Sequence, residues 1–129
     1  MDLETARKLA IENCLDGPDW ALDPDTPIDQ IRALIGSGGG CGPGATWGDW
    51  MVPDTMWGLN MKPVCYLHDC CYHDADNEAR RHVCDLLLFT NGTTYIRAHS
   101  ANWFMVWLRL KRLGKYFRMV NLGGGGFVD

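Results

Sequence analysis

The sequence has no apolar run of the roughly 18 residues that a membrane-spanning helix requires. The start of the chain, Met1 to Lys8, is charged and amphipathic, which is not the pattern of a secretory signal peptide. We therefore expect no transmembrane segment. The route by which the protein would be exported is left open.

Acidic residues are nearly missing from the C-terminal third of the chain. Residues 86–129 carry one acidic and six basic residues, a charge of +5, whereas residues 1–85 carry 15 acidic and six basic residues, a charge of −9. A basic segment can bind nucleic acid or an anionic membrane, although a solvated helix face is the simpler interpretation. On charge alone, the solvated helix face is favoured.

Convincing strand patterns and internal repeats are also absent, so the chain is predicted to be mainly α. Apolar residues recur at helical spacing, and Gly or Pro separates the helical segments. With 129 residues, the chain has the length of a single domain. Asn91-Gly92 suits a helix C-cap. The predicted helices cover residues 2–15, 28–35, 63–76, 78–90 and 93–120.

Cysteine, in contrast, is abundant, with six residues in a small chain. An even number of this size favours disulfides and an oxidising compartment over free cytosolic thiols. Three of the six surround a His-Asp pair in the segment Val64 to Asp76. This segment could be a metal site, a disulfide staple or the working end of an enzyme.

A closed zinc site would need four sulfur or imidazole ligands. The segment and the helix after it offer too many candidates and no clean zinc spacing. The candidates are Cys65, His68, Cys71, His73, His82 and Cys84.

Helix geometry favours a different arrangement. If residues 63–76 and 78–90 form antiparallel helices, the register that brings Cys71 to Cys84 also brings His68 to Asp85. A disulfide between the two cysteines would then fix the imidazole against the carboxylate. A carboxylate beside an imidazole sets its tautomer and stabilises its cation, although a purely structural hydrogen bond is also common.

Asp69 raises the odds of function. It points about 100° away from His68 around the helix, so its carboxylate can bind something else. A hard oxygen ligand near the Gly-rich segment Gly36 to Gly44 suggests Ca²⁺, which prefers carboxylates and backbone carbonyls.

These elements resemble the secreted phospholipases A2. The run Cys65-Tyr-Leu-His-Asp-Cys-Cys-Tyr72 is similar to that family's catalytic helix at every fixed position. Gly40-Cys-Gly-Pro-Gly44 is similar to its calcium loop, and Cys84-Asp85 to the Cys-Asp of its next helix. The resemblance covers residues 40 to 90, and its strength lies in three elements occurring in order with paired cysteines.

The resemblance implies a fold and a metal site. The fold would be a small, mainly α, disulfide-linked domain with two antiparallel catalytic helices and a Gly-rich calcium loop. The Ca²⁺ ligands would be the carbonyls of Gly40, Gly42 and Gly44 and the carboxylate of Asp69. The implied disulfides are Cys41–Cys65 and Cys71–Cys84. Cys14 and Cys70 remain and could form a third bridge.

The implied activity is calcium-dependent hydrolysis of the sn-2 ester of glycerophospholipids. His68 would be the general base that activates a water, Asp85 would orient it, and Tyr72 would hydrogen-bond to Asp85. Ca²⁺ would stabilise the oxyanion, with help from a loop amide such as that of Gly42.

Several features depart from the animal members of the family. The adjacent cysteines, Cys70-Cys71, follow the histidine instead of preceding it. The segment between loop and histidine is long and rich in Trp and Met, and recognisable strands are missing. The chain is more similar to short microbial or viral members. The expected layout is N-terminal helices over 1–35, calcium loop and Trp-rich segment over 36–62, catalytic helix pair over 63–90, C-terminal helix over 93–120 and flexible tail over 121–129.

An enzyme that acts on aggregated lipid needs an apolar rim around its site. The candidates for it, which could equally cover the core, are Trp47, Trp50, Met51, Trp57 and Met61. The segment from Trp103 to Leu108, with the bases that follow it, resembles an interfacial helix, although at least half of its apolar residues should pack in the core. Asn91-Gly-Thr93 is a glycosylation sequon.

The sequence therefore predicts a secreted, monomeric phospholipase A2 that meets a phospholipid membrane or micelle and no nucleic acid. Two alternatives remain, a membrane-binding protein without catalysis and a zinc-stapled interaction module. Intact His68, Asp69 and Asp85 argue against the first alternative.

Overall fold

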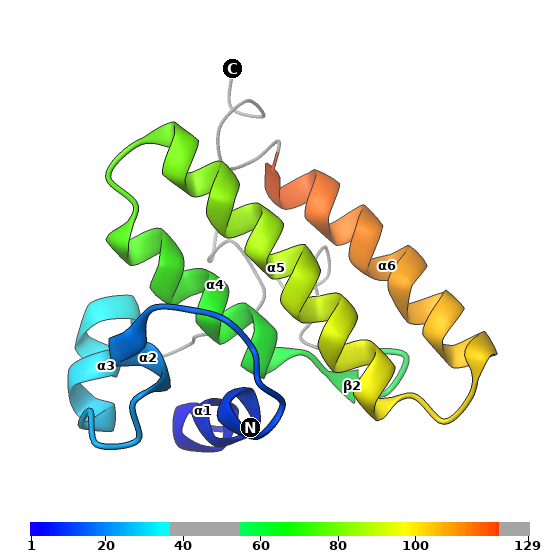
Figure 1. Cartoon of the computed structure of the whole chain (residues 1–129), viewed down its shortest axis with the longest axis horizontal. Coiled ribbons are helices and arrows are strands. Elements are labelled where there is room, and N and C mark those ends of the chain that lie inside the picture. The colour runs from blue at the N-terminus through cyan, green and yellow to red at the C-terminus, as the bar shows by residue number, and fades with distance from the viewer. Residues whose placement is uncertain (37–54, 122–129) are drawn as a thin grey trace.

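The computed structural model describes residues 1–36 and 55–121 of the chain (Figure 1). Over this part the protein is mainly α, as the sequence predicts. The elements are α1 (Leu3–Glu12), α2 (Asp19–Leu22), α3 (Ile28–Ile35), β1 (Thr55–Met56), β2 (Leu59–Asn60), α4 (Lys62–Asp74), α5 (Glu78–His99) and α6 (Trp103–Asn121). None of the described helices is long and apolar enough to cross a membrane.

Three helices form the main layer of the molecule. In Figure 1, α5 lies between α4 and α6, and each of these packs along it. The short helices α1, α2 and α3 gather against α4, on the side away from α6. The core lies where these elements meet, and its fully buried side chains include Ile31, Leu67, Leu88, Ile96 and Leu113.

Local capping interactions fix where helices α4 and α5 begin. Pro63 lies in the first turn of α4, and the Asn60 side chain accepts a hydrogen bond from the Lys62 amide. Three residues after α4 ends, the Asn77 side chain caps α5 by accepting from the Arg80 amide at 2.9 Å. The short turn makes the two helices antiparallel neighbours, as the sequence predicts.

The predicted C-cap at Asn91-Gly92 is wrong, because α5 continues through both residues to His99. The Asn91 side chain accepts from the Asp16 amide and donates to the Asp16 carbonyl. A Cβ on Gly92 would lie 2.7 Å from Leu113 Cδ2, so the missing side chain lets α6 approach closely. The two residues serve packing here and do not end the helix.

The third long helix starts ten residues later than predicted, at Trp103 instead of Thr93. The break falls at Ser100–Asn102, where Ser100 has extended backbone and the Asn102 side chain accepts from the Met105 amide. Beyond the break, α6 runs on through Gly114.

The first helix ends earlier than predicted. Cys14 has a φ of 56°, in the left-handed region, and its amide donates to the Ile11 carbonyl while the Leu15 amide donates to Ala10. This pairing is the Schellman motif, whose left-handed position is usually glycine. The sequence has no glycine there, so the helix was predicted to continue to Leu15. The four-residue helix α2, after Pro18, was also not predicted.

The predicted absence of strands is also wrong. β1 and β2 form a small antiparallel hairpin in which Met56 pairs with Leu59. Trp57 and Gly58 form its turn, both with positive φ, as a two-residue primed turn requires. The buried Arg109 of α6 donates to the carbonyls of Met56 and Trp57 and so fastens the hairpin to α6.

Candidate functional site

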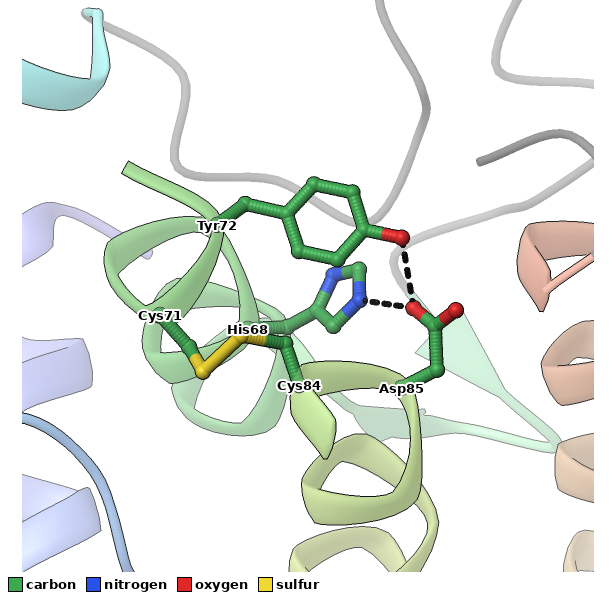
Figure 2. A network of polar contacts seen from close by, with 5 residues as sticks. All are labelled: His68, Cys71, Tyr72, Cys84 and Asp85. Carbon is green, nitrogen blue, oxygen red and sulfur yellow. Dashed lines mark hydrogen bonds and ion pairs between the residues drawn. A yellow bond between two sulfur atoms is a disulfide. The ribbon is translucent and has the colours of Figure 1, made fainter. Parts of the chain in front are cut away.

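The α4–α5 pair brings His68 and Asp85 together, as the predicted register requires. His68 Nε2 lies 2.8 Å from Asp85 Oδ1 (Figure 2). The residues are only 6 % and 1 % exposed. A buried carboxylate without a partner would be costly, so this contact satisfies both groups and fixes the orientation of the ring.

Tyr72 completes the network from the next turn of α4. Its hydroxyl donates to the same Asp85 Oδ1 at 2.7 Å, and its ring lies against the imidazole with centroids 4.4 Å apart (Figure 2). Burial, and then the hydrogen bond to the Asp85 carboxylate, raise the pKa of Tyr72 above its ordinary value. The phenol therefore stays protonated and remains a donor to Asp85.

The geometry selects one tautomer of the histidine. An ionised carboxylate only accepts hydrogen bonds, so Nε2 of His68 must carry its hydrogen. In the neutral ring, Nδ1 then holds the lone pair, and it lies on the other side of the imidazole from Asp85 (Figure 2). This leaves an oriented base that can take a proton at one defined atom.

A disulfide locks this geometry. Cys71 and Cys84 are bonded, with their Cα atoms 5.6 Å apart (Figure 2). Cys71 lies three residues after His68, on the same face of α4, and Cys84 precedes Asp85. The bridge thus joins the two helices beside the residues that must stay in register, and this predicted pairing is confirmed.

The remaining cysteines agree with the prediction only in part. Cys65 is disulfide-bonded, and its predicted partner, Cys41, lies outside the described residues. Cys14 and Cys70 are free thiols, so the third bridge is wrong. Cys70 is buried on α4, and burial, followed by the charge of Asp69, raises the pKa of its thiol to about 12. It is therefore a protonated core residue at neutral pH.

The disulfides remove sulfur ligands that the predicted zinc site would need. Cys65, Cys71 and Cys84 are all oxidised, whereas zinc requires the thiolate. Among the described residues, no group of three or more His, Cys, Asp and Glu side chains could hold a metal ion.

The predicted calcium ligands fall in two parts of the chain. Gly40, Gly42 and Gly44 lie outside the described residues. Asp69 follows His68 on α4 and is half-buried, within one helical step of the base. Its carboxylate is the kind of hard oxygen donor that Ca²⁺ takes, and the calcium site itself stays a prediction.

The predicted apolar rim divides between core and surface. Met61 is buried in the core, whereas Trp57 at the hairpin turn is 56 % exposed. Trp47, Trp50 and Met51 lie outside the described residues. The predicted sequon is wrong as an accessible site, because Asn91 is 3 % exposed and both ends of its amide bind Asp16.

Sequence reasoning missed Arg109. Its guanidinium is buried and donates to four oxygens, those of Met56, Trp57, His99 and the Ser100 hydroxyl. It therefore ties the end of α5, the start of α6 and the hairpin together. The available signal was its place among the apolar positions of α6, together with Leu113 and Tyr116.

Compared with models of protein families, with curated proteins and with solved structures, the chain shows no match. Function must therefore be argued from the site itself.

Proposed function

We propose that the protein is a calcium-dependent phospholipase A2 that hydrolyses the sn-2 ester of glycerophospholipids. The observation that carries the proposal is the buried His68–Asp85–Tyr72 network, held in register by the Cys71–Cys84 disulfide. The order of the sequence motifs, which resembles that of the secreted phospholipases A2, supplies the substrate class.

The chemistry follows from the tautomer of His68. Nδ1 takes a proton from a water molecule as the water oxygen attacks the ester carbonyl. Asp85 stabilises the imidazolium that forms, and Tyr72 holds Asp85 in place. When the tetrahedral intermediate collapses, the imidazolium returns its proton to the leaving alkoxide. The products are a free fatty acid and a lysophospholipid.

Calcium would be held by Asp69 and by backbone carbonyls of the predicted loop, Gly40, Gly42 and Gly44. When bound, it supplies a Lewis acid that polarises the ester carbonyl and stabilises the oxyanion. The chain's own contribution on α4 is the position of Asp69, next to the base.

Apolar surface on α5 supports a lipid substrate. Val83, Leu86 and Phe89 on this helix are all exposed. Exposed apolar side chains on the helix that carries Asp85 offer a surface that acyl chains could contact. The disulfide also favours an oxidising, extracellular compartment.

A lipid-binding protein without catalysis is the second candidate. The observation that favours it is the exposed aromatic surface at the start of α6, where Trp103 is 78 % exposed. That candidate gives no reason for the buried network or for its single tautomer, so we place it second.

The test is release of fatty acid from phospholipid vesicles by wild type, His68→Ala and His73→Ala, each with Ca²⁺ and with a chelator. His73 is the matched control, because it is an exposed histidine on the same helix, outside the network. We expect His68→Ala to lose at least about a hundredfold in rate and chelation to stop wild type and control alike. Turnover that survives both changes would refute the proposal.

A further inference from the structure

The outward face of α6 is a surface of two parts. Its first turns expose three aromatic side chains, Trp103, Phe104 and Trp107, which are 78 %, 50 % and 51 % exposed. The Phe104 ring contacts both others, with centroids 6.1 Å and 6.2 Å apart. Helical spacing then places Lys111, Lys115 and Arg118 further along the same face, all exposed.

Trp57 is a fourth exposed ring, at the turn of the hairpin that packs beside α6. Its φ of 48° is in the left-handed region, which a bulky side chain rarely adopts. Arg109 holds it there by binding the carbonyls of Met56 and Trp57. Glycine or asparagine would make this turn with less strain, so the tertiary structure keeps an exposed tryptophan at a position that disfavours it.

The charge of this face is of one sign. From Leu86 to Val128 the sequence contains no Asp or Glu, so neither α6 nor the part of α5 beside it offers an acidic partner. Lys111 lies 5.2 Å from the centroid of the Trp107 ring. The rings and cations therefore act as one aromatic and basic surface.

We infer that this face of α6, with Trp57, is the surface by which the protein docks on an anionic lipid bilayer. Aromatic side chains favour the headgroup boundary, and basic residues are attracted to anionic lipid. The opposite face of α6, with Arg109, Leu113 and Tyr116, is buried. The helix therefore lies along the lipid surface while it remains packed on the protein.

Other partners fit less well. A second copy would present the same cations, which would repel across a symmetric interface. A single-stranded nucleic acid would stack its bases on successive ring faces, but here Trp103 and Phe104 meet edge to face, and the Trp107 ring already stacks with Phe104 and has Lys111 beside it. Anionic lipid requires only exposed rings and positive charge.

The aromatic end of the docking surface is separate from the His-Asp network. The aromatic end of α6 lies beside the end of α5, where Arg109 binds the carbonyl of His99, whereas Phe117 contacts Phe89. Between Asp85 and His99, α5 rises about 20 Å. The inference rests on the proposed function only in making the docked lipid the substrate, so the two can be tested apart.

The docking test uses the full chain carrying His68→Ala, which removes turnover. Its binding is measured by flotation with vesicles of phosphatidylcholine alone and with added phosphatidylglycerol. We expect binding to the anionic vesicles, loss of that binding in Trp103→Ala/Phe104→Ala/Trp107→Ala, and loss of the anionic preference in Lys111→Glu/Lys115→Glu. Lys8→Glu and Leu34→Ala, exposed residues on other helices, are the matched controls and should bind normally.

Trp57→Gly separates docking from stability. Glycine relieves the left-handed turn, so this variant should unfold at a higher temperature, yet bind anionic vesicles about tenfold more weakly because one ring is lost. Unchanged vesicle binding by the triple aromatic variant would overturn the inference. The inference would also be overturned if that variant lost only dimer formation or single-stranded DNA binding.

The proposed function is tested separately with a short-chain phospholipid below its micelle concentration. The triple aromatic variant with an intact His68 should hydrolyse this monomeric lipid at the wild-type rate. Vesicle binding without hydrolysis would refute the proposed enzyme activity and support the docking surface. Hydrolysis without vesicle binding would support the activity and refute the docking surface.

Discussion

The α4–α5 pair and the outer face of α6 use similar residues in opposite ways. In the pair, a buried imidazole and a half-buried phenol are both hydrogen-bonded to one buried carboxylate. On α6, indoles and cations face outward, and within the described residues their ring contacts are with one another. Buried titratable groups that bind one another are typical of a reactive site with fixed geometry. Exposed apolar groups with charges of one sign are typical of a surface that binds a partner.

The largest expected effect is on the buried network. Asp85→Asn should lower kcat by about a thousandfold or more, because an amide no longer fixes the Nε2–H tautomer of His68 or stabilises its cation. The rate of lipid hydrolysis measures this, with circular dichroism to verify folding. Asp76→Asn, at an exposed carboxylate in the turn between the two helices, is the control and should keep its activity. An equal loss in both variants would contradict the assigned role.

The second effect concerns the Cys71–Cys84 disulfide, which joins α4 to α5. Replacing Cys71 and Cys84 by serine should lower the free energy of unfolding by about 3 kcal/mol, the scale for a closed loop of roughly this length. Urea unfolding measures it. Cys14→Ser, at a free thiol, is the control. A loss below about 1 kcal/mol would show that packing alone holds the pair.

The third prediction contrasts two glycines across the α5–α6 contact. Gly92→Ala should destabilise the fold by about 1–3 kcal/mol, because its Cβ would press on the buried Leu113. Gly114→Ala on α6 meets nothing within 4 Å and should stabilise by up to about 1 kcal/mol through helix propensity. Thermal unfolding measures both. The same sign for both substitutions would contradict the close helix contact.

A smaller gain is expected at the end of α1. Cys14→Gly should raise the free energy of unfolding by about 1 kcal/mol, because glycine adopts the left-handed conformation without strain. Cys14→Ala keeps the Cβ and should give no such gain. If alanine stabilised as much as glycine, loss of the thiol and not relief of strain would be the cause.

The last prediction concerns the stability of the fold at alkaline pH and implies no change at neutral pH. Burial raises the pKa of Cys70 from 9.0 to about 12 and also raises the pKa values of Tyr66, Tyr72 and Tyr95, all on α4 or α5. Between pH 9 and 12 the folded protein holds a Cys70 proton that the unfolded chain has lost. Stability is therefore full below about pH 9 and falls as pH rises toward 12.

Denaturant midpoints measured across this pH range test the assignment. Cys70→Ala should reduce the slope, since it removes one of the raised groups. A stability that rises with pH above 9 would contradict the buried, protonated state of these residues.

Much of the candidate site could be predicted because it depends on local spacing. His68 and Cys71 share a helix face, and a three-residue turn fixes the register of α5 against α4. This register places Cys84 against Cys71 and Asp85 against His68. The third bridge failed because Cys14 and Cys70 lie on different elements, and nothing local in the sequence brings them together or keeps them apart.

The length of α5 could not be predicted from its own residues. Asn91-Gly92 has the composition of a helix end, but Asn91 binds the backbone of Asp16, 75 residues earlier in the chain. The hairpin depends in the same way on Arg109, which is 52 residues from the Trp57 carbonyl that it binds. Both contacts join segments that are distant in sequence, so local propensity does not reveal them.

By itself, the sequence determined the helical class and the pairing of His68 with Asp85, because helix periodicity and a short turn act over a few residues. The tertiary structure decided where α5 ends, why Asn91 is buried and how Trp57 is held at its turn. These outcomes depend on buried polar groups finding partners across the fold, and a buried group takes whichever partner the packing of distant elements supplies.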